Sequence, residues 1–377
     1  MKKKILSIFL MIVLLFTFTS CSKFDYKEAM KNAKDKLQNS KKVEASTEIK
    51  FNEGFSEKVV DLAKFAEPDM PEADLNNLSK GAKVISDVEL SSYQKANLED
   101  LKMYFDLDLS YKGKEFVKGN VFMNDEYIRL DVKDLLTQAV TFKFSAFDEL
   151  MSQQNPSSDI KIGDMIKEQI KVSQTNGKKL YPIITSEIEK NVKEPEVKEG
   201  KLSYFDDKKI DTNIVEYKVD YIKALEIVKN LLSNEEFINI YAELQMNQND
   251  YLKQMGAPEN ALVTKEKVTK QLNEASKQID KVLNNEDFKT AFKDYNVTVS
   301  YYFDDGLKAI KYNLDFVNYM VKYKSLGKEI KFEKYDTQKD YVVESMQGMY
   351  GIMGILNQSK VSELQNHELF KDLQSIE

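Results

Sequence analysis

Apolar residues recur along this chain with two periods, one helical and one extended. The first helical stripe consists of Tyr26, Met30, Ala33 and Leu37. Their 4-3-4 spacing places them on one face of an amphipathic helix. From residue 43 to residue 51, apolar or small residues alternate with polar ones, which predicts a strand with one solvated face. Residues 56–66 then predict a short helix.

The clearest extended region follows. We expect strands at residues 82–92, 101–111, 116–123 and 127–132. The third of these is separated from the second by Lys112-Gly113-Lys114, where glycine accepts the positive φ of a tight turn. Because connections this short join antiparallel neighbours, the region predicts a β-meander.

The remaining two thirds of the chain alternates between helical and extended patterns. We expect helices within 135–192, with a polar break at 155–158, and at 222–232 and 268–282. We expect strands at 202–205, 215–221, 297–303, 310–316 and 328–335, with 341–343 as an extension of the last. We expect residues 193–201 to form a charged connection between secondary-structure elements. Asn234 and Thr264 are the expected N-caps of the helices that follow them.

These elements predict an α+β fold, in which a curved antiparallel sheet of half-barrel-like meanders is covered by amphipathic helices. The continuous apolar side of the sheet would include Phe105, Leu107, Leu109, Phe303, Tyr312 and Phe316. The cover would come from helices within 56–66, 135–192 and 222–284. We interpret 43–377 as one large domain. A weak repeat of Phe-Asp-Asp at 205–207 and 303–305 leaves open a boundary near 193–201.

The N-terminus has the pattern of an export signal. Three lysines (Lys2, Lys3, Lys4) precede an apolar run from Ile5 to Phe18, and small residues lead to Cys21. The run is shorter than the roughly 20 residues that a spanning helix needs. We therefore predict a signal peptide over 1–20.

Cys21 is the only cysteine in the chain. Its position resembles the lipobox of bacterial lipoproteins, with Phe18 where that family usually has an aliphatic residue. The resemblance implies that Cys21 receives a diacylglycerol and becomes the new N-terminus. Residues 21–42 would then form the lipid anchor and a basic helix, at the extracytoplasmic face of the cell membrane. The alternative is an ordinary secretory signal with an incidental cysteine.

The charge distribution along the chain limits the classes of molecule that the protein could bind. The formal net charge of −7 becomes −10 without the three N-terminal lysines, and an acidic body argues against nucleic-acid binding. Residues 23–42 differ, because seven lysines stand against three acidic residues there. This segment could face an anionic membrane or form an ordinary solvated helix face. The preference for lysine over arginine is typical of a low-GC Gram-positive organism.

No catalytic motif stands out, and we predict no enzyme activity, metal or cofactor. His367 is the sole histidine and lies near a polar C-terminus, where a surface position is expected. Asp206-Asp207 and Asp304-Asp305 could hold calcium, but aspartate is also a common turn residue. Asp106 and Asp108 could serve a glycosidase, although a solvated strand face is the simpler interpretation.

A methionine- and glycine-rich segment lies near the C-terminus. It contains Met346, Met349 and Met353, interleaved with Gly348, Gly351 and Gly354. Methionine adapts to ligands of varied shape, so the segment could line or cover an apolar site. Ordinary core packing is the alternative.

The overall arrangement resembles that of the LolA/LppX-type lipoproteins, in which a half-barrel sheet covered by helices holds acyl chains. The resemblance is architectural, extends from about Lys23 onward, and transfers no site residue. It implies a membrane-anchored lipoprotein that binds an apolar or lipid-like ligand without covalent chemistry. The alternative is an envelope scaffold or adaptor that binds another protein.

Overall fold

The computed structural model describes residues 24–154, 161–254, 257–314, 316–374 and 376. Its strands are β1 (Lys42–Phe51), β2 (Val88–Asn97), β3 (Lys102–Tyr111), β4 (Lys114–Met123), β5 (Tyr127–Val132), β6 (Val140–Lys143), β7 (Glu196–Ser203), β8 (Lys209–Asp220), β9 (Asn296–Phe303), β10 (Leu307–Asn313), β11 (Val317–Leu326) and β12 (Tyr341–Val343).

All twelve strands join one sheet, in the order β12-β6-β5-β4-β3-β2-β1-β11-β10-β9-β8-β7. Every neighbouring pair is antiparallel except β12 and β6, which run parallel. The two outermost strands do not pair with each other, so the sheet is curved and open. The predicted α+β class is confirmed.

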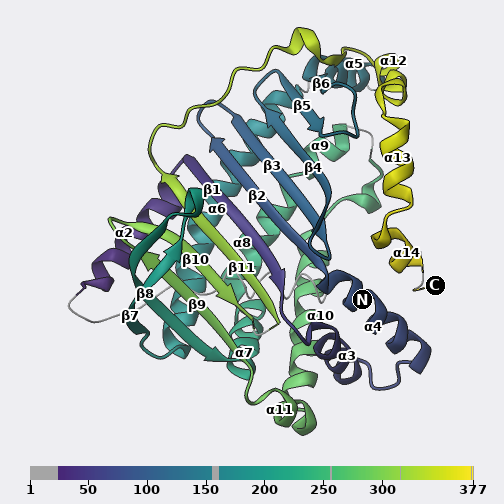
Figure 1. Cartoon of the computed structure of the whole chain (residues 1–377). Helices are drawn as coiled ribbons and strands as arrows, with labels where there is room; N and C mark the ends of the chain where they lie inside the picture. Colours follow the sequence, from purple (N-terminus) through teal and green to yellow (C-terminus); the bar gives the residue numbers. More distant parts are fainter. Residues whose placement is uncertain (1–23, 155–160, 255–256, 315, 375, 377) are drawn as a thin grey trace.

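The longer helices are α2 (Tyr26–Asn39), α3 (Phe55–Ala66), α4 (Glu72–Ser86), α5 (Phe144–Gln154), α6 (Ile162–Asn191), α7 (Tyr221–Leu232), α8 (Glu235–Met246) and α10 (Lys265–Leu283). Shorter ones are α9 (Asn249–Gln254), α11 (Glu286–Phe292), α12 (Met346–Tyr350), α13 (Gln358–Gln365) and α14 (Glu368–Gln374), with 3-10 turns η1 (Phe205–Asp207), η2 (Glu259–Ala261), η3 (Thr337–Lys339) and η4 (Gly351–Ile355). Figure 1 shows α6, α8 and α10 behind the sheet, all on one face.

Strand register separates the sheet into an apolar face and a polar face. On the apolar face, three rows of paired residues cross the middle strands: Val121-Phe105-Gln94-Ala45-Tyr323, Gly119-Leu107-Ser92-Thr47-Val321-Ile310 and Val117-Leu109-Leu90-Ile49-Tyr319-Tyr312. None of these residues is charged. The alternating positions on the polar face include Glu44, Asp106, Lys118 and Lys322.

Helices bury the apolar face over β8, β9 and β10. Val215, Tyr301 and Phe303 are at most 1 % exposed and pack with apolar residues of α6, α7 and α10. Phe288 and Phe292 on α11 stack at 4.6 Å between ring centroids within the same core. Burial of this area is the main favourable contribution to folding.

The helix boundaries follow the capping chemistry expected from the sequence. The Asn234 side chain accepts a hydrogen bond from the Phe237 amide at 2.9 Å, and Thr264 accepts one from Lys267 at 3.2 Å. Helix α2 packs its predicted stripe onto the core, with Tyr26, Met30 and Ala33 buried. These predictions are confirmed.

Several expected elements are wrong. Residues 82–86 belong to α4, and β2 begins only at Val88, because Leu75, Leu78 and Ala82 continue a helical stripe. The predicted helical region 135–192 contains β6, which is four residues long and too short for a clear period. The expected connection 193–201 contains the start of β7, an edge strand. The break at 155–158 lies outside the described residues.

The end of the chain after β10 also differs from expectation. β11 occupies 317–326, whereas residues 328–335 form no strand and instead lead across the sheet toward β12. The carboxylate of Asp340, 3 % exposed, holds this segment in place. It accepts hydrogen bonds from Arg129 at 2.9 Å and Thr141 at 2.7 Å. The alternating pattern of 328–335 therefore reflects contacts across the sheet surface, such as Phe332 and Tyr335 on Phe122.

Candidate ligand-binding site

The apolar face is not covered evenly. On β3, Phe105 is 38 % exposed and Leu107 is 44 % exposed, although β3 is an interior strand. Their neighbours Leu109, Val121 and Leu130 are only half-buried. We call the area formed by these five residues the open section. It is continuous with the face that is fully buried under helices on β8 and β9.

The path of helix α6 accounts for the change in helical cover along the apolar face of the sheet. Near its start, a Cβ on Gly163 would lie 3.2 Å from the carbonyl of Asp125, at the β4–β5 turn. Near its end, Ile188 is 1 % exposed within the main core. The helix therefore crosses from the β4–β5 end of the apolar face to the β8–β9 end (Figure 1).

Gly177, in the middle of α6, borders open space. It shares a helical stripe with Tyr181, Ile184 and Ile188, which contact the core. Gly177 itself is exposed, and no heavy atom lies within 4 Å of the position that its Cβ would take. The stripe thus leaves the core between Tyr181 and Gly177.

Pro182 lies close to this transition inside α6. A proline has no amide hydrogen, so the helix lacks one internal hydrogen bond there. The C-terminal part of α6 is packed on the core, and Leu180 is the last large apolar residue before the open part.

Tyrosine hydroxyls line the other end of the apolar face. Tyr312 and Tyr319 are paired across β10 and β11, with ring centroids 5.6 Å apart. Tyr323 lies in the same row as Phe105, three strands away, which corresponds to roughly 14 Å. Tyr312 and Tyr323 are only half-buried by accessible area.

These phenols are nevertheless deep in the protein. Burial raises the pKa of Tyr312 and of Tyr323 far above the usual value for tyrosine. Within the described part of the chain, neither hydroxyl makes a hydrogen bond, whereas Tyr319 bonds to Thr47.

Two further polar groups, one on α6 and one on β8, are buried without a partner among the described residues. They are the side-chain amide nitrogen of Gln169 on α6 and the hydroxyl of Tyr217 on β8. A buried polar group without a hydrogen bond costs roughly 1–3 kcal/mol.

The predicted acidic sites are ordinary surface features. Asp106 and Asp108 lie on the polar face, away from the open section, and Asp108 pairs with Lys118 at 3.2 Å. Asp206 and Asp207 have positive φ in the turn η1. Asp305 pairs with Lys308 in the β9–β10 hairpin. In the described residues no acidic, histidine or cysteine cluster could hold a metal ion.

His367 and the methionine-rich segment have structural surroundings. The His367 ring packs on Phe116 at 4.8 Å between centroids, and its Nδ1 accepts a hydrogen bond from Leu369. Met349 packs in a small cluster with Val140 and Val343, away from the open section. Met353 is 67 % exposed, and neighbouring Tyr350 is 81 % exposed.

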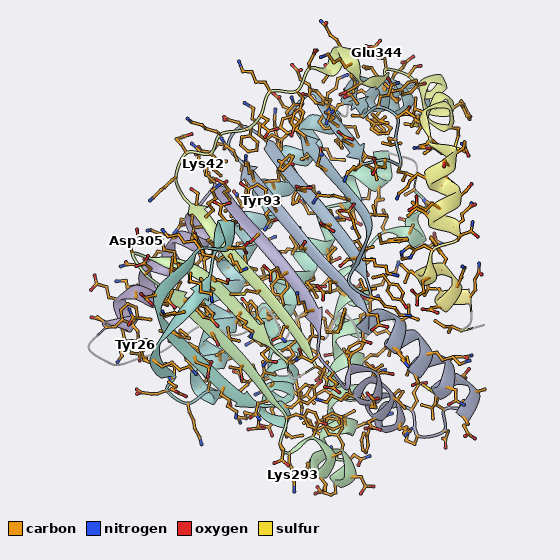
Figure 2. All side chains as sticks on the ribbon, in the orientation of Figure 1. Tyr26, Lys42, Tyr93, Lys293, Asp305 and Glu344 are labelled. Carbon is orange, nitrogen blue, oxygen red and sulfur yellow. The ribbon has the colours of Figure 1, made fainter. Side chains whose placement is uncertain are left out.

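The predicted lipidation residue, Cys21, lies outside the described residues. The basic helix α2 that follows it is fixed to the body of the protein. Lys34 lies 4.6 Å from the centre of the Tyr181 ring, and Lys42 pairs with Glu99 at 3.5 Å. Tyr26 on α2 and Asp305 lie at one side of the molecule, and Glu344 lies at the opposite side (Figure 2).

A second cluster, on the polar face, was not predicted from the sequence. The Tyr93 hydroxyl donates to Glu44, and Lys324 lies 3.1 Å from the same carboxylate. Phe205, from the β7–β8 turn, packs on Tyr93 at 6.3 Å between ring centroids. Because these polar groups satisfy one another, the cluster is best explained as a contact that holds the turn on the sheet.

Comparison with protein-family models, with curated proteins and with solved structures finds no match to this chain. Among the described residues, no helix is both long and apolar enough to cross a bilayer. Two hollows on the outer surfaces of α10 and of α6–α8 are lined chiefly by charged residues such as Lys265 and Lys167. Neither suits an apolar ligand, so the open section is the better candidate site.

Proposed function

We propose that this protein is a membrane-anchored extracytoplasmic lipoprotein that binds an apolar or lipid-like ligand without covalent chemistry. The ligand would lie between the open section of the sheet and the N-terminal half of α6. The observation that carries the proposal is the exposure of Phe105 and Leu107 on an interior strand. The space beside Gly177 supports it from the opposite side.

The energetics favour an apolar occupant. Full burial of a leucine or phenylalanine side chain contributes about 1.5–3 kcal/mol. Because Leu107 and Phe105 are 44 % and 38 % exposed, covering what remains would contribute about 1 kcal/mol for each residue. The half-buried neighbours add to this, which is sufficient for a hydrocarbon chain to prefer the site over water.

The membrane anchor in the proposal rests on Cys21 and the lysines that follow it. Tyr26 is fixed in the core only five residues after Cys21, so a lipid on that cysteine would hold the body close to the bilayer. Lys27, Lys31 and Lys36 are exposed on α2. Basic side chains near an anionic surface gain on the order of 1 kcal/mol each.

A fluorescence titration tests the ligand site. Diphenylhexatriene, a hydrocarbon dye, is added to protein expressed without residues 1–20, and fluorescence enhancement reports binding. Leu107→Ser should weaken binding several-fold, whereas Ile85→Ser on α4 should have no effect. Ile85 is the matched control because it is 47 % exposed but outside the open section. Equal effects of the two substitutions, or no enhancement with the unmodified protein, would refute the site.

A second candidate function is that of an adaptor for another envelope protein. It is favoured by Tyr350 and Met353, which protrude at the α12–η4 turn with 81 % and 67 % exposure. Large apolar side chains exposed to this extent are frequent at protein interfaces. Crosslinking from position 353 in intact cells, followed by identification of the product, distinguishes a protein partner from none.

A further inference from the structure

The chemistry of the apolar face limits what kind of ligand it can accept. The three rows that connect the open section with Tyr312 and Tyr323 contain no charged residue. The facing stripe of α6, through Ile170, Gly177 and Tyr181, is also uncharged. An ionised head group carried into this layer would lose its hydration without meeting a counter-ion, which costs several kcal/mol.

The lysines on β11 do not offset the cost of burying an ionised head group. Lys322 pairs with Glu48 at 2.6 Å and Lys324 with Glu44 at 3.1 Å, both on the polar face. Lys34 is the cation beside the helical layer, where it lies over the Tyr181 ring and is attracted by Glu189. An added carboxylate would have to compete with these partners.

The same layer does offer hydrogen bonds to a neutral group. The Tyr312 and Tyr323 hydroxyls are accessible and make no hydrogen bond within the described part of the chain. A phenol that remains protonated can donate to a carbonyl or hydroxyl oxygen. Tyr323 is in line with Phe105 across β11, β1, β2 and β3, although Ala45 between them is fully buried, so an elongated molecule that reaches both has to pass over the neighbouring Thr47 and Ser92.

We infer that the ligand is an uncharged amphiphile, a fatty alcohol or ester, with its oxygen-bearing end held by Tyr312 and Tyr323 and its chain on Phe105 and Leu107. This inference rests on the proposed function and adds the class of ligand to it. A charged lipid would bind only with its head group left in solvent, and its acyl chain alone would reach the open section.

Competition against diphenylhexatriene at pH 8 tests the inference with three ligands of equal chain length. Dodecanol and methyl dodecanoate should displace the dye at concentrations at least tenfold lower than dodecanoate, which is ionised at this pH. The double variant Tyr312→Phe/Tyr323→Phe should bind dodecanol roughly tenfold more weakly, since one hydrogen bond changes affinity about 3- to 10-fold. Its affinity for the dye, which accepts no hydrogen bond, should fall by much less.

Controls separate this inference from the proposed function. Tyr350→Phe removes a hydroxyl from an exposed tyrosine outside the site and should leave dodecanol binding unaltered. Equal displacement by dodecanoate, or loss of its binding in Lys34→Gln, would overturn the inference while the apolar site stands. Failure of the dye to bind any variant would overturn the proposed function itself.

Discussion

Substitution of Gly177 by phenylalanine is expected to block the ligand site without harming the fold. Gly177 lies on the helical stripe that Tyr181 and Ile184 continue into the core, and a Cβ there meets no neighbouring element within 4 Å. A phenyl ring at this position would enter the space above the open section. Most core-facing substitutions of this size cause overpacking that costs about 1–3 kcal/mol, but here there is nothing to displace.

Gly177→Phe is expected to stabilise the protein rather than destabilise it. Glycine in a helix interior is about 1 kcal/mol less favourable than alanine, and phenylalanine about 0.5 kcal/mol less favourable. Gly177→Phe should therefore stabilise the protein by about 0.5 kcal/mol and leave its melting temperature unchanged or raised by about 1 °C. Gly177→Ala should be more stabilising still, because alanine adds no ring to the site.

The assay combines thermal unfolding with diphenylhexatriene titration on the same preparations. Gly177→Phe should lose dye binding by more than tenfold, and Gly177→Ala should retain most of it. Lys178→Phe is the control, since it adds the same ring one residue along and about 100° around the helix, at an exposed position. Unaltered dye binding in Gly177→Phe would refute the reasoning, and so would a clear loss of stability, which would mean that the space is already filled.

Further predictions concern stability, pH and the membrane anchor. Asp340→Ala should destabilise the protein by about 3 kcal/mol in denaturant unfolding, because it removes the buried carboxylate that accepts from Arg129 and leaves Arg129 the longer contact with Asp131, at 3.6 Å; no change would contradict the account of β12. Hydrogen bonds from Tyr111 and Lys112 lower the pKa of Asp372, so the attachment of α14 should persist above about pH 4 and be lost as the pH falls through that lowered pKa. Hydrogen exchange of α14 measures this, and Asp372→Asn together with Glu368→Gln should abolish the dependence, because the hydrogen bond from Lys112 also lowers the pKa of Glu368. Intact mass of membrane-expressed protein should show a diacylglyceryl group on Cys21, and a free thiol there would exclude the anchor.

Alternation was the most reliable guide to this fold. The strands around Phe105 and around Tyr301 each have a clean two-residue period, and both are correctly predicted because one face is apolar and the other polar along their length. The two-residue period gave a wrong prediction where extended and helical patterns overlap. Ala82 to Ser86 fits both an extended and a helical pattern, and the helical stripe of Leu75, Leu78 and Ala82 decides in favour of α4.

The sequence also predicted residues of the apolar face, with the exception of Phe316, which lies in the β10–β11 connection, but not which of them stay exposed. Exposure of Leu107 depends on the path of α6, which is set by contacts far away at Ile188 and near Asp125. One local signal was available. Gly177 interrupts an otherwise apolar helical stripe, and a glycine at such a position indicates either close helix packing or open space.

Lipid extraction of the natively purified, membrane-expressed protein tests the central claim most directly. Organic extraction followed by mass spectrometry should recover a neutral, oxygen-bearing lipid in near-stoichiometric amount from the unmodified protein and much less from Gly177→Phe. Equal recovery from both proteins would show that bound lipid does not occupy the space beneath α6. Recovery of none from either, together with no dye binding, would contradict the account and favour the adaptor.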